Sequence, residues 1–249
     1  MSHKNICIGE VSYTTYGTPM KIIEYKDNKH VTIEFQDQYK IRKQCYYLAF
    51  KKGLVSNPYD KSVLGMACIG NINTKEHSKA YEVWKFILTR CYPKTINLHN
   101  QSYQVCTVAD EWLCFENFCY WYEEHYYCAF NEKMCVDKDI LIKGNKIYSP
   151  DTCLIVPYTI NMLFAKRKGC RGEFPIGVSF NKSKQKYHAC CSVEGRSTSL
   201  GVYNTPEEAF NAYKIFKEQY IKKVADKYKE QIPKKLYDAL YAYIVEITD

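Results

Sequence analysis

Two carboxylates and one amide stand close together in the middle of the sequence. Asp137 and Asp139 follow the apolar run Met134–Val136, and Asn161 lies one turn into a predicted helix. Alternate residues of an extended segment share a face, so the two acids should point the same way. Carboxylate and amide oxygens suit a hard cation such as Mg²⁺. These residue types therefore predict a site for Mg²⁺, or for Mn²⁺ in its place.

The stretch Lys133–Phe164 predicts the elements that would position these side chains. Lys143-Gly144-Asn145 is a turn signal after a first strand, and Thr152–Val156 is a β-branched run typical of a second strand. Pro157 suits the first position of a helix, which would continue through Tyr158–Ala165. A hairpin packed on this helix would bring the three oxygen-bearing side chains together. The alternative is that the acids are solvated turn residues and the amide lies on a helix surface.

This order of residues resembles the ββα-metal core of HNH endonucleases, as carried by free-standing phage homing-type nucleases. Two upstream segments, AYEVWKFILTRCY (Ala80–Tyr92) and VCTVADEWLCFENFCYW (Val105–Trp121), resemble the block that precedes the core in such proteins. The resemblance implies a role for four residues: Asp137 and Asp139 at the end of the first strand, Asn145 in the loop and Asn161 on the helix.

The sequence departs from this family because Lys133–Phe164 contains no histidine, and HNH nucleases normally use one as general base. The nearest histidines are His99 and His125. Two alternatives stay open. In the first, Asp137, Asp139 and His125 are the candidate catalytic residues of a DNA endonuclease. In the second, the nuclease frame is inactive, and the chain is a DNA-binding regulator or an inhibitor of a host defence system that targets nucleic acids.

A second informative segment, Phe174–Tyr228, predicts three strands and a helix. Thr205, Pro206 and Glu208 form the signature of a capping box that begins this helix. The order Gly-Val … Tyr-x-Ala … Leu-Gly-x-Tyr-x-Thr-x-Glu-Glu-Ala-x-x-Ala-Tyr is similar to the DNA-binding domain of plant APETALA/ethylene-response-factor proteins. The resemblance implies a sheet that enters the major groove of double-stranded DNA.

Alternation along these strands places polar side chains on one face of the predicted sheet. The candidate DNA contacts there and in the turns are Lys182, Lys184, Lys186, His188 and Arg196. Members of that family typically use several Arg and Trp on this face, and bidentate Arg–guanine contacts discriminate bases most strongly. The Lys, Ser and His of this chain therefore predict weaker sequence specificity.

The charge distribution points to the same region. The chain has a formal net charge of +8, and Lys166–Lys235 holds 16 Lys and Arg against 7 Asp and Glu. A basic region of this kind is typical of a surface that binds phosphates. Further candidate phosphate contacts are Arg90 and four residues of the linker Ala165–Glu173: Lys166, Arg167, Lys168 and Arg171.

The overall prediction is an α+β chain with four regions. We expect a small SH3-like β-barrel over 1–64, an HNH-like ββα-metal domain with flanking helices over 75–165, a three-stranded sheet plus helix over 172–230, and an extension over 231–249 that docks or self-associates. The barrel strands are expected at Lys21–Tyr25, His30–Phe35 and Tyr39–Arg42, and a single helix is expected over Asp110–Tyr127.

The 13 cysteines do not form a CxxC pair, so we expect reduced thiols and no zinc site. The start MSHKNICIGE lacks an apolar leader, and no apolar run approaches the length of a membrane span. We therefore expect a cytoplasmic protein without membrane partners, in the host cell cytoplasm if it is encoded by a phage.

Overall fold

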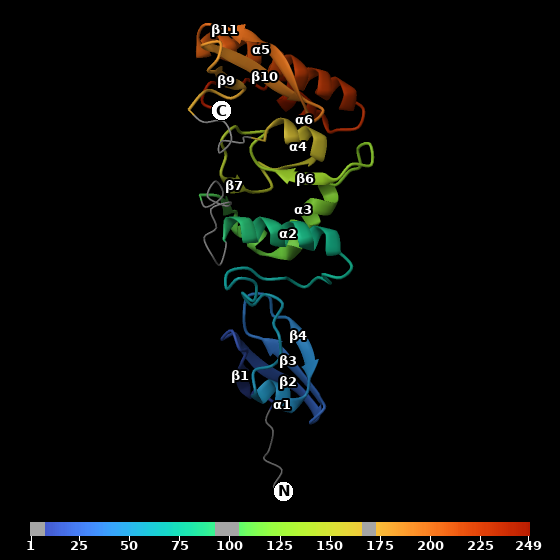
Figure 1. Ribbon diagram of the computed structural model, residues 1–249. Helices are drawn as coiled ribbons and strands as arrows, with labels where there is room; N and C mark the ends of the chain where they lie inside the picture. The colour runs from blue at the N-terminus through green and yellow to red at the C-terminus, as the bar shows by residue number, and fades with distance from the viewer. Residues whose placement is uncertain (1–7, 93–104, 166–172) are drawn as a thin grey trace. The chain divides into compact units, whose positions relative to one another are not determined.

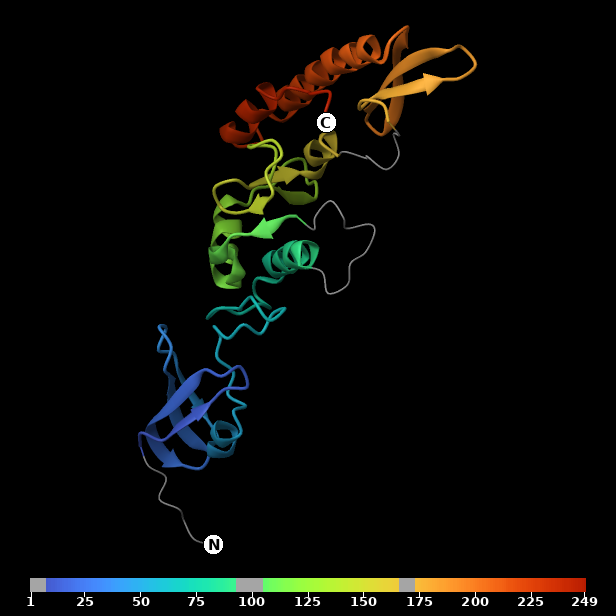
Figure 2. The same ribbon diagram turned by 90° about the vertical axis from the view of Figure 1, so that its left-hand side faces the viewer.

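The computed structural model describes residues 8–92, 105–165 and 173–249 (Figures 1 and 2). The mixed α+β class is confirmed, because small sheets and helices alternate along the described chain. The chain divides into two compact units, Met1–Glu124 with Ile147–Ser149, and His125–Lys146 with Pro150–Asp249. The four domain boundaries expected from the sequence stay a prediction.

The N-terminal region is an antiparallel sheet of four strands in sequence order. Its strands are β1 (Val11–Tyr13), β2 (Pro19–Asp27), β3 (His30–Phe35) and β4 (Arg42–Cys45), and the short helix α1 (Tyr47–Lys51) follows. Alternate residues of β2 and β3 are fully buried and pack with Phe50 of α1. The expected closed barrel is not found among the described residues, in which β1 and β4 are the edges of an open sheet.

The strand expected at Tyr39–Arg42 begins later than predicted, at Arg42. The carboxylate of Asp37 accepts hydrogen bonds from the backbone N–H groups of Tyr39 and Lys40, at 3.0 and 3.1 Å. Lys40 has a φ of 51°, which is a turn conformation. This local side-chain bond therefore competes with the strand and delays it.

After α1, the chain forms helix α2 (Ser78–Cys91), a 3₁₀ helix η2 (Asp110–Leu113) and helix α3 (Phe115–His125). These three helices share an aromatic core in which the Trp84 indole donates a 2.7 Å hydrogen bond to the carbonyl of Trp112. The single helix expected over Asp110–Tyr127 is wrong. Cys114 is extended and bridges to Cys68, and this tertiary pairing interrupts the helix.

The second unit contains a short hairpin followed directly by a helix. Strand β6 (Met134–Asp137) pairs antiparallel with β8 (Leu154–Pro157), and α4 (Tyr158–Leu163) begins at the next residue. The chain between these strands includes β7 (Ile147–Tyr148), which belongs to the first unit and pairs there in parallel with β5 (Thr107–Val108). The expected order of strand, loop, strand and helix is present.

The three strands and the helix expected after residue 174 are also present. The sheet has the order β11-β10-β9, with β9 at Val178–Asn181, β10 at Lys186–Val193 and β11 at Arg196–Tyr203. Helix α5 (Pro206–Tyr228) begins with the predicted capping box, in which Thr205 and Glu208 exchange side-chain and backbone hydrogen bonds. Helix α6 (Lys234–Tyr241) follows.

Helix α5, the long helix that follows the sheet in Figure 1, contributes residues to two hydrophobic cores within this unit. Its N-terminal half buries Ala209, Phe210 and Tyr213 against the inner face of the sheet. Its C-terminal half packs against the hairpin strand β8, helix α4 and helix α6. Leu236 and Leu240 of α6 are fully buried there, so the C-terminal extension docks on its own chain.

No helix in the part of the chain that the structure describes combines the length and the apolar character of a membrane span. Every cysteine among these residues is a free thiol.

Candidate metal centre and nucleic-acid interface

Asp137 ends strand β6 and begins a tight turn. Its Oδ1 accepts hydrogen bonds from the backbone N–H groups of Asp139 and Ile140, at 2.9 and 2.8 Å. Asp139 therefore lies in the turn, and the strand alternation that placed both acids on one face does not extend to it. Burial, together with the nearby charge of Asp139, raises the pKa of Asp137 to about 6.

Lys138 is the residue that the sequence argument overlooked at this site. Its side chain is only 8% exposed, and its ammonium lies 3.1 Å from Oδ2 of Asp139. The same ammonium donates to the carbonyl of Asn145 at 2.9 Å, and the Asn145 amide donates to the carbonyl of Lys138 at 2.7 Å. Asn145 thus holds the hairpin loop closed, and a cation bound at Asp139 would compete with an internal ammonium.

The other two candidate residues, Asn161 and His125, are not part of the hydrogen-bond network of this turn. Asn161 is half-buried on α4, and no hydrogen bond among the described residues joins its amide to Asp137 or Asp139. His125 is the exposed last residue of α3, and its ring nitrogens do not form a cluster within 4.8 Å with the two carboxylates. Convergence of Asp137, Asp139 and Asn161 on one ion, with His125 as a candidate catalytic residue, stays a prediction.

The hairpin loop is anchored to the C-terminal segment of the chain. The Lys143 ammonium donates to the carbonyl of Ile244 and to the carboxylate of Asp249, both at 2.8 Å. Tyr243 has its pKa raised mainly by burial and further by the charges of Asp249 and Asp139. The C-terminal segment therefore lies beside the acidic turn.

The candidate nucleic-acid interface is the outer face of the three-stranded sheet. Strands β9, β10 and β11 read VSFN, KYHACCSV and RSTSLGVY, so none contains an acidic residue. Ala189 and Cys191 are buried toward α5, whereas Ser179, Lys186 and Ser192 are exposed. His188 bonds across the strands to the Ser199 hydroxyl at 2.7 Å. The predicted alternation of polar and apolar faces is present.

The turn between β9 and β10 presents two of the predicted lysines in a defined geometry. The Asn181 side chain accepts hydrogen bonds from the backbone N–H groups of Ser183 and Lys184, both at 3.1 Å. Lys182 and Lys184 are exposed, as is Arg196 in the first position of β11. These cations therefore stand at the edges of a sheet face that has no acidic side chain on its strands.

The roles of the remaining candidate phosphate contacts stay predictions. The Arg90 guanidinium lies 4.7 Å from the centre of the Phe86 ring, in the other compact unit. Lys166, Arg167, Lys168 and Arg171 lie outside the described residues.

Comparisons with protein-family models, with curated protein sequences and with solved structures gave no match. The functional assignment therefore depends on the residues and their arrangement in this chain.

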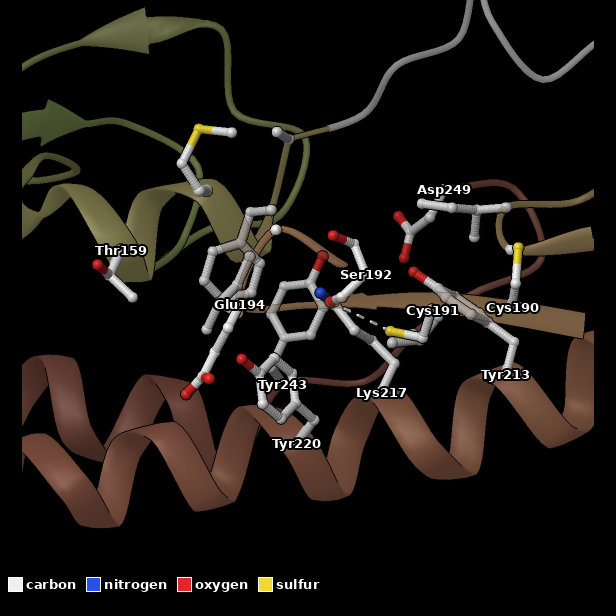
Figure 3. A pocket seen from close by; sticks show the side chains of 18 of the residues that line it. Thr159, Cys190, Cys191, Ser192, Glu194, Tyr213, Lys217, Tyr220, Tyr243 and Asp249 are labelled. Atoms are coloured by element: carbon white, nitrogen blue, oxygen red, sulfur yellow. Dashed lines mark hydrogen bonds between the residues drawn. The ribbon is translucent and has the colours of Figure 1, made fainter. Parts of the chain in front are cut away.

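A cavity of about 590 Å³ lies between α4, the end of β10 and α5 (Figure 3). Its lining includes Lys217, which is only 8% exposed and forms no ion pair with any described residue. Burial lowers the pKa of the Lys217 ammonium below its usual range, and the neighbouring Cys191 thiol partly opposes this shift. Helical spacing is the signal that could have identified this position, because Lys217 lies four residues after the buried Tyr213 and four before the buried Ile221. The residue type alone favours a solvated position.

We expect the Lys217→Met variant to be more stable than the unaltered chain at pH 7, with a free energy of unfolding roughly 1 kcal/mol higher. The substitution removes a buried ammonium that lacks an ionic partner. Burial lowers the pKa of Lys217 in the folded state, so the charged side chain destabilises the fold by its full amount at any pH below that pKa. The destabilisation decreases as the pH rises from the folded-state pKa toward the pKa of lysine in the unfolded chain, about 10.4. Urea unfolding at pH 7 and at pH 10 should show the variant's advantage shrinking at the higher pH.

Lys214→Met is the matched control for this measurement. The Lys214 ammonium lies 2.6 Å from the Glu218 carboxylate and 2.7 Å from the carbonyl of Val245. Its removal should lower the free energy of unfolding. Destabilisation by both substitutions at pH 7 would show that the Lys217 ammonium has a stabilising partner.

Proposed function

We propose that this chain binds double-stranded DNA through the outer face of β9–β11. The observation that supports this most strongly is an exposed sheet face without acidic residues on its strands and with cations at its edges. Lysines at such positions contact phosphates with little base selectivity, so a general affinity for duplexes fits better than strict sequence recognition.

We further propose that the hairpin β6–β8 and helix α4 form an HNH-like nuclease core. Asp137, Asp139 and Asn161 would supply oxygen ligands for Mg²⁺ or Mn²⁺, which stabilises charge on the leaving 3′ oxygen when bound. Asp137 is the proposed base, because its carboxylate ends strand β6 beside the proposed ion and could take a proton from a bound water. The N-terminal sheet would be an SH3-like accessory module.

A second candidate function is favoured by the contact between the Lys138 ammonium and Asp139. An internal cation at the acidic turn can replace a metal ion, and the hairpin region contains no histidine. The chain would then be an inactive nuclease frame that binds DNA as a regulator or inhibits a host defence system. Both functions share the sheet interface and differ at the hairpin.

The DNA-binding proposal predicts a localised effect of charge removal. Changing Lys182, Lys184, Lys186 and Arg196 together to Gln should weaken duplex binding strongly. Each lost phosphate contact should also reduce the slope of log affinity against log salt by about 0.9. Fluorescence anisotropy with a labelled duplex over a salt series measures both quantities.

The matched control changes four exposed lysines on α5, on α6 and between them, namely Lys223, Lys229, Lys234 and Lys235, to Gln. It removes the same total charge from another surface of this unit. Affinity close to that of the unaltered chain is expected for the control. Equal losses in both variants would show that binding depends on net charge alone.

The nuclease proposal predicts nicking of supercoiled plasmid in Mg²⁺ or Mn²⁺. Asp137→Asn should abolish nicking because it removes the proposed base, and Asn161→Ala should reduce it because it removes a metal ligand. Both variants should retain duplex binding, since the sheet is unchanged. Nicking that survives Asp137→Asn would place the active site elsewhere. Tight binding without nicking in either metal would favour the inactive frame.

A further inference from the structure

A second cluster of potential metal ligands lies far from the hairpin in the sequence, in the first compact unit. His77 immediately precedes α2, and Cys119 and Glu123 stand four residues apart on α3. Residues with this spacing share one face of a helix. The nucleic-acid and nuclease proposals use none of these three side chains.

The three ligand atoms are close together and differ in exposure. The imidazole, thiol and carboxylate atoms all lie within 4.8 Å of one another, and Nδ1 of His77 is 2.5 Å from Oε1 of Glu123. Cys119 is fully buried, whereas the side chains of His77 and Glu123 are 25% and 51% exposed. The thiol therefore approaches from the interior, and the other two groups leave one side open to solvent.

We propose that His77, Cys119 and Glu123 bind a zinc ion, or a similar divalent transition metal ion, with water as the fourth ligand. Sulfur, nitrogen and carboxylate oxygen are the three donor types that zinc binds in proteins, at about 2.0–2.3 Å. Ligand atoms around a tetrahedral ion at these distances are about 3.5 Å apart. The three ligand atoms reach that spacing if the imidazole and the carboxylate move slightly apart and the thiol moves toward both of them.

Metal binding at this cluster requires the loss of the thiol proton. The buried Cys119 thiol lies beside the hydrogen-bonded pair of His77 and Glu123, whose side chains reach solvent. Zinc would bind the thiolate and release its proton to solvent, so that one Zn–S bond forms as one S–H bond breaks.

Such an ion would connect the start of α2 to α3. These helices already share the core that contains Trp84 and Phe115, and the ion would fix their ends at the surface. The sequence spacing did not reveal the cluster, because its histidine and cysteine belong to separate helices and no cysteine pair is involved. This proposal is independent of the functions proposed for the sheet and the hairpin.

Cobalt(II) titration of the full chain after EDTA treatment tests the site, since Co²⁺ replaces zinc and is coloured. We expect one equivalent to produce the visible bands of tetrahedral Co²⁺ and a sulfur-to-cobalt charge-transfer band. Cys119→Ser should remove the charge-transfer band. His77→Gln and Glu123→Gln should weaken binding at least about tenfold, because losing even an outer-shell partner costs about 10–100-fold.

Cys114→Ser is the matched control, because Cys114 is also buried and lies directly before α3. Its spectrum should equal that of the unaltered chain. Circular dichroism checks folding of each variant, and Glu123→Gln changes a side chain that is 51% exposed. Absence of one-equivalent binding, or a charge-transfer band that survives Cys119→Ser, would overturn the proposal and leave a plain His–Glu hydrogen bond.

Discussion

Burial along α5 is the interaction on which the second unit depends. One helix of 23 residues, about 35 Å long, contributes side chains to the core under the sheet and to the core under the hairpin. Because the same rigid element belongs to both cores, the proposed DNA-binding face and the acidic turn cannot move independently without exposing apolar surface. A duplex held by the sheet would therefore meet the hairpin in a restricted range of positions.

The hairpin shows how a single lysine changes the chemistry of an acidic turn. Asp137 is half-buried and accepts two backbone hydrogen bonds, whereas Asp139 pairs with Lys138. The Lys138 side chain is 8% exposed and the Asp139 side chain 41%, so removal of the Asp139 carboxylate would leave a buried ammonium without its ionic partner. A metal ion bound at Asp139 would have to displace the Lys138 ammonium from this carboxylate.

Local sequence signals predicted the C-terminal sheet and helix well. The capping box at Thr205 and the alternation in β10 act through neighbouring residues, and the structure confirms both. The hairpin followed by a helix was predicted for the same reason. These elements form largely where their own residues favour them.

Tertiary contacts account for what the sequence did not predict. The helix break at Cys114 depends on pairing with Cys68, a residue far away in the sequence. The ion pair of Lys138 depends on how the loop closes through Asn145. The approach of His77 to Cys119 depends on the packing of two helices. No local sequence pattern contains this information.

Lysine footprinting in the presence of DNA tests the central claim most directly. The full chain, with and without a duplex, would be acetylated briefly, and modified lysines would be quantified by mass spectrometry. The account predicts that DNA protects Lys182, Lys184 and Lys186, while Lys229, Lys234 and Lys235 react as before. Protection of the second group with unchanged reactivity of the first would contradict the proposed interface.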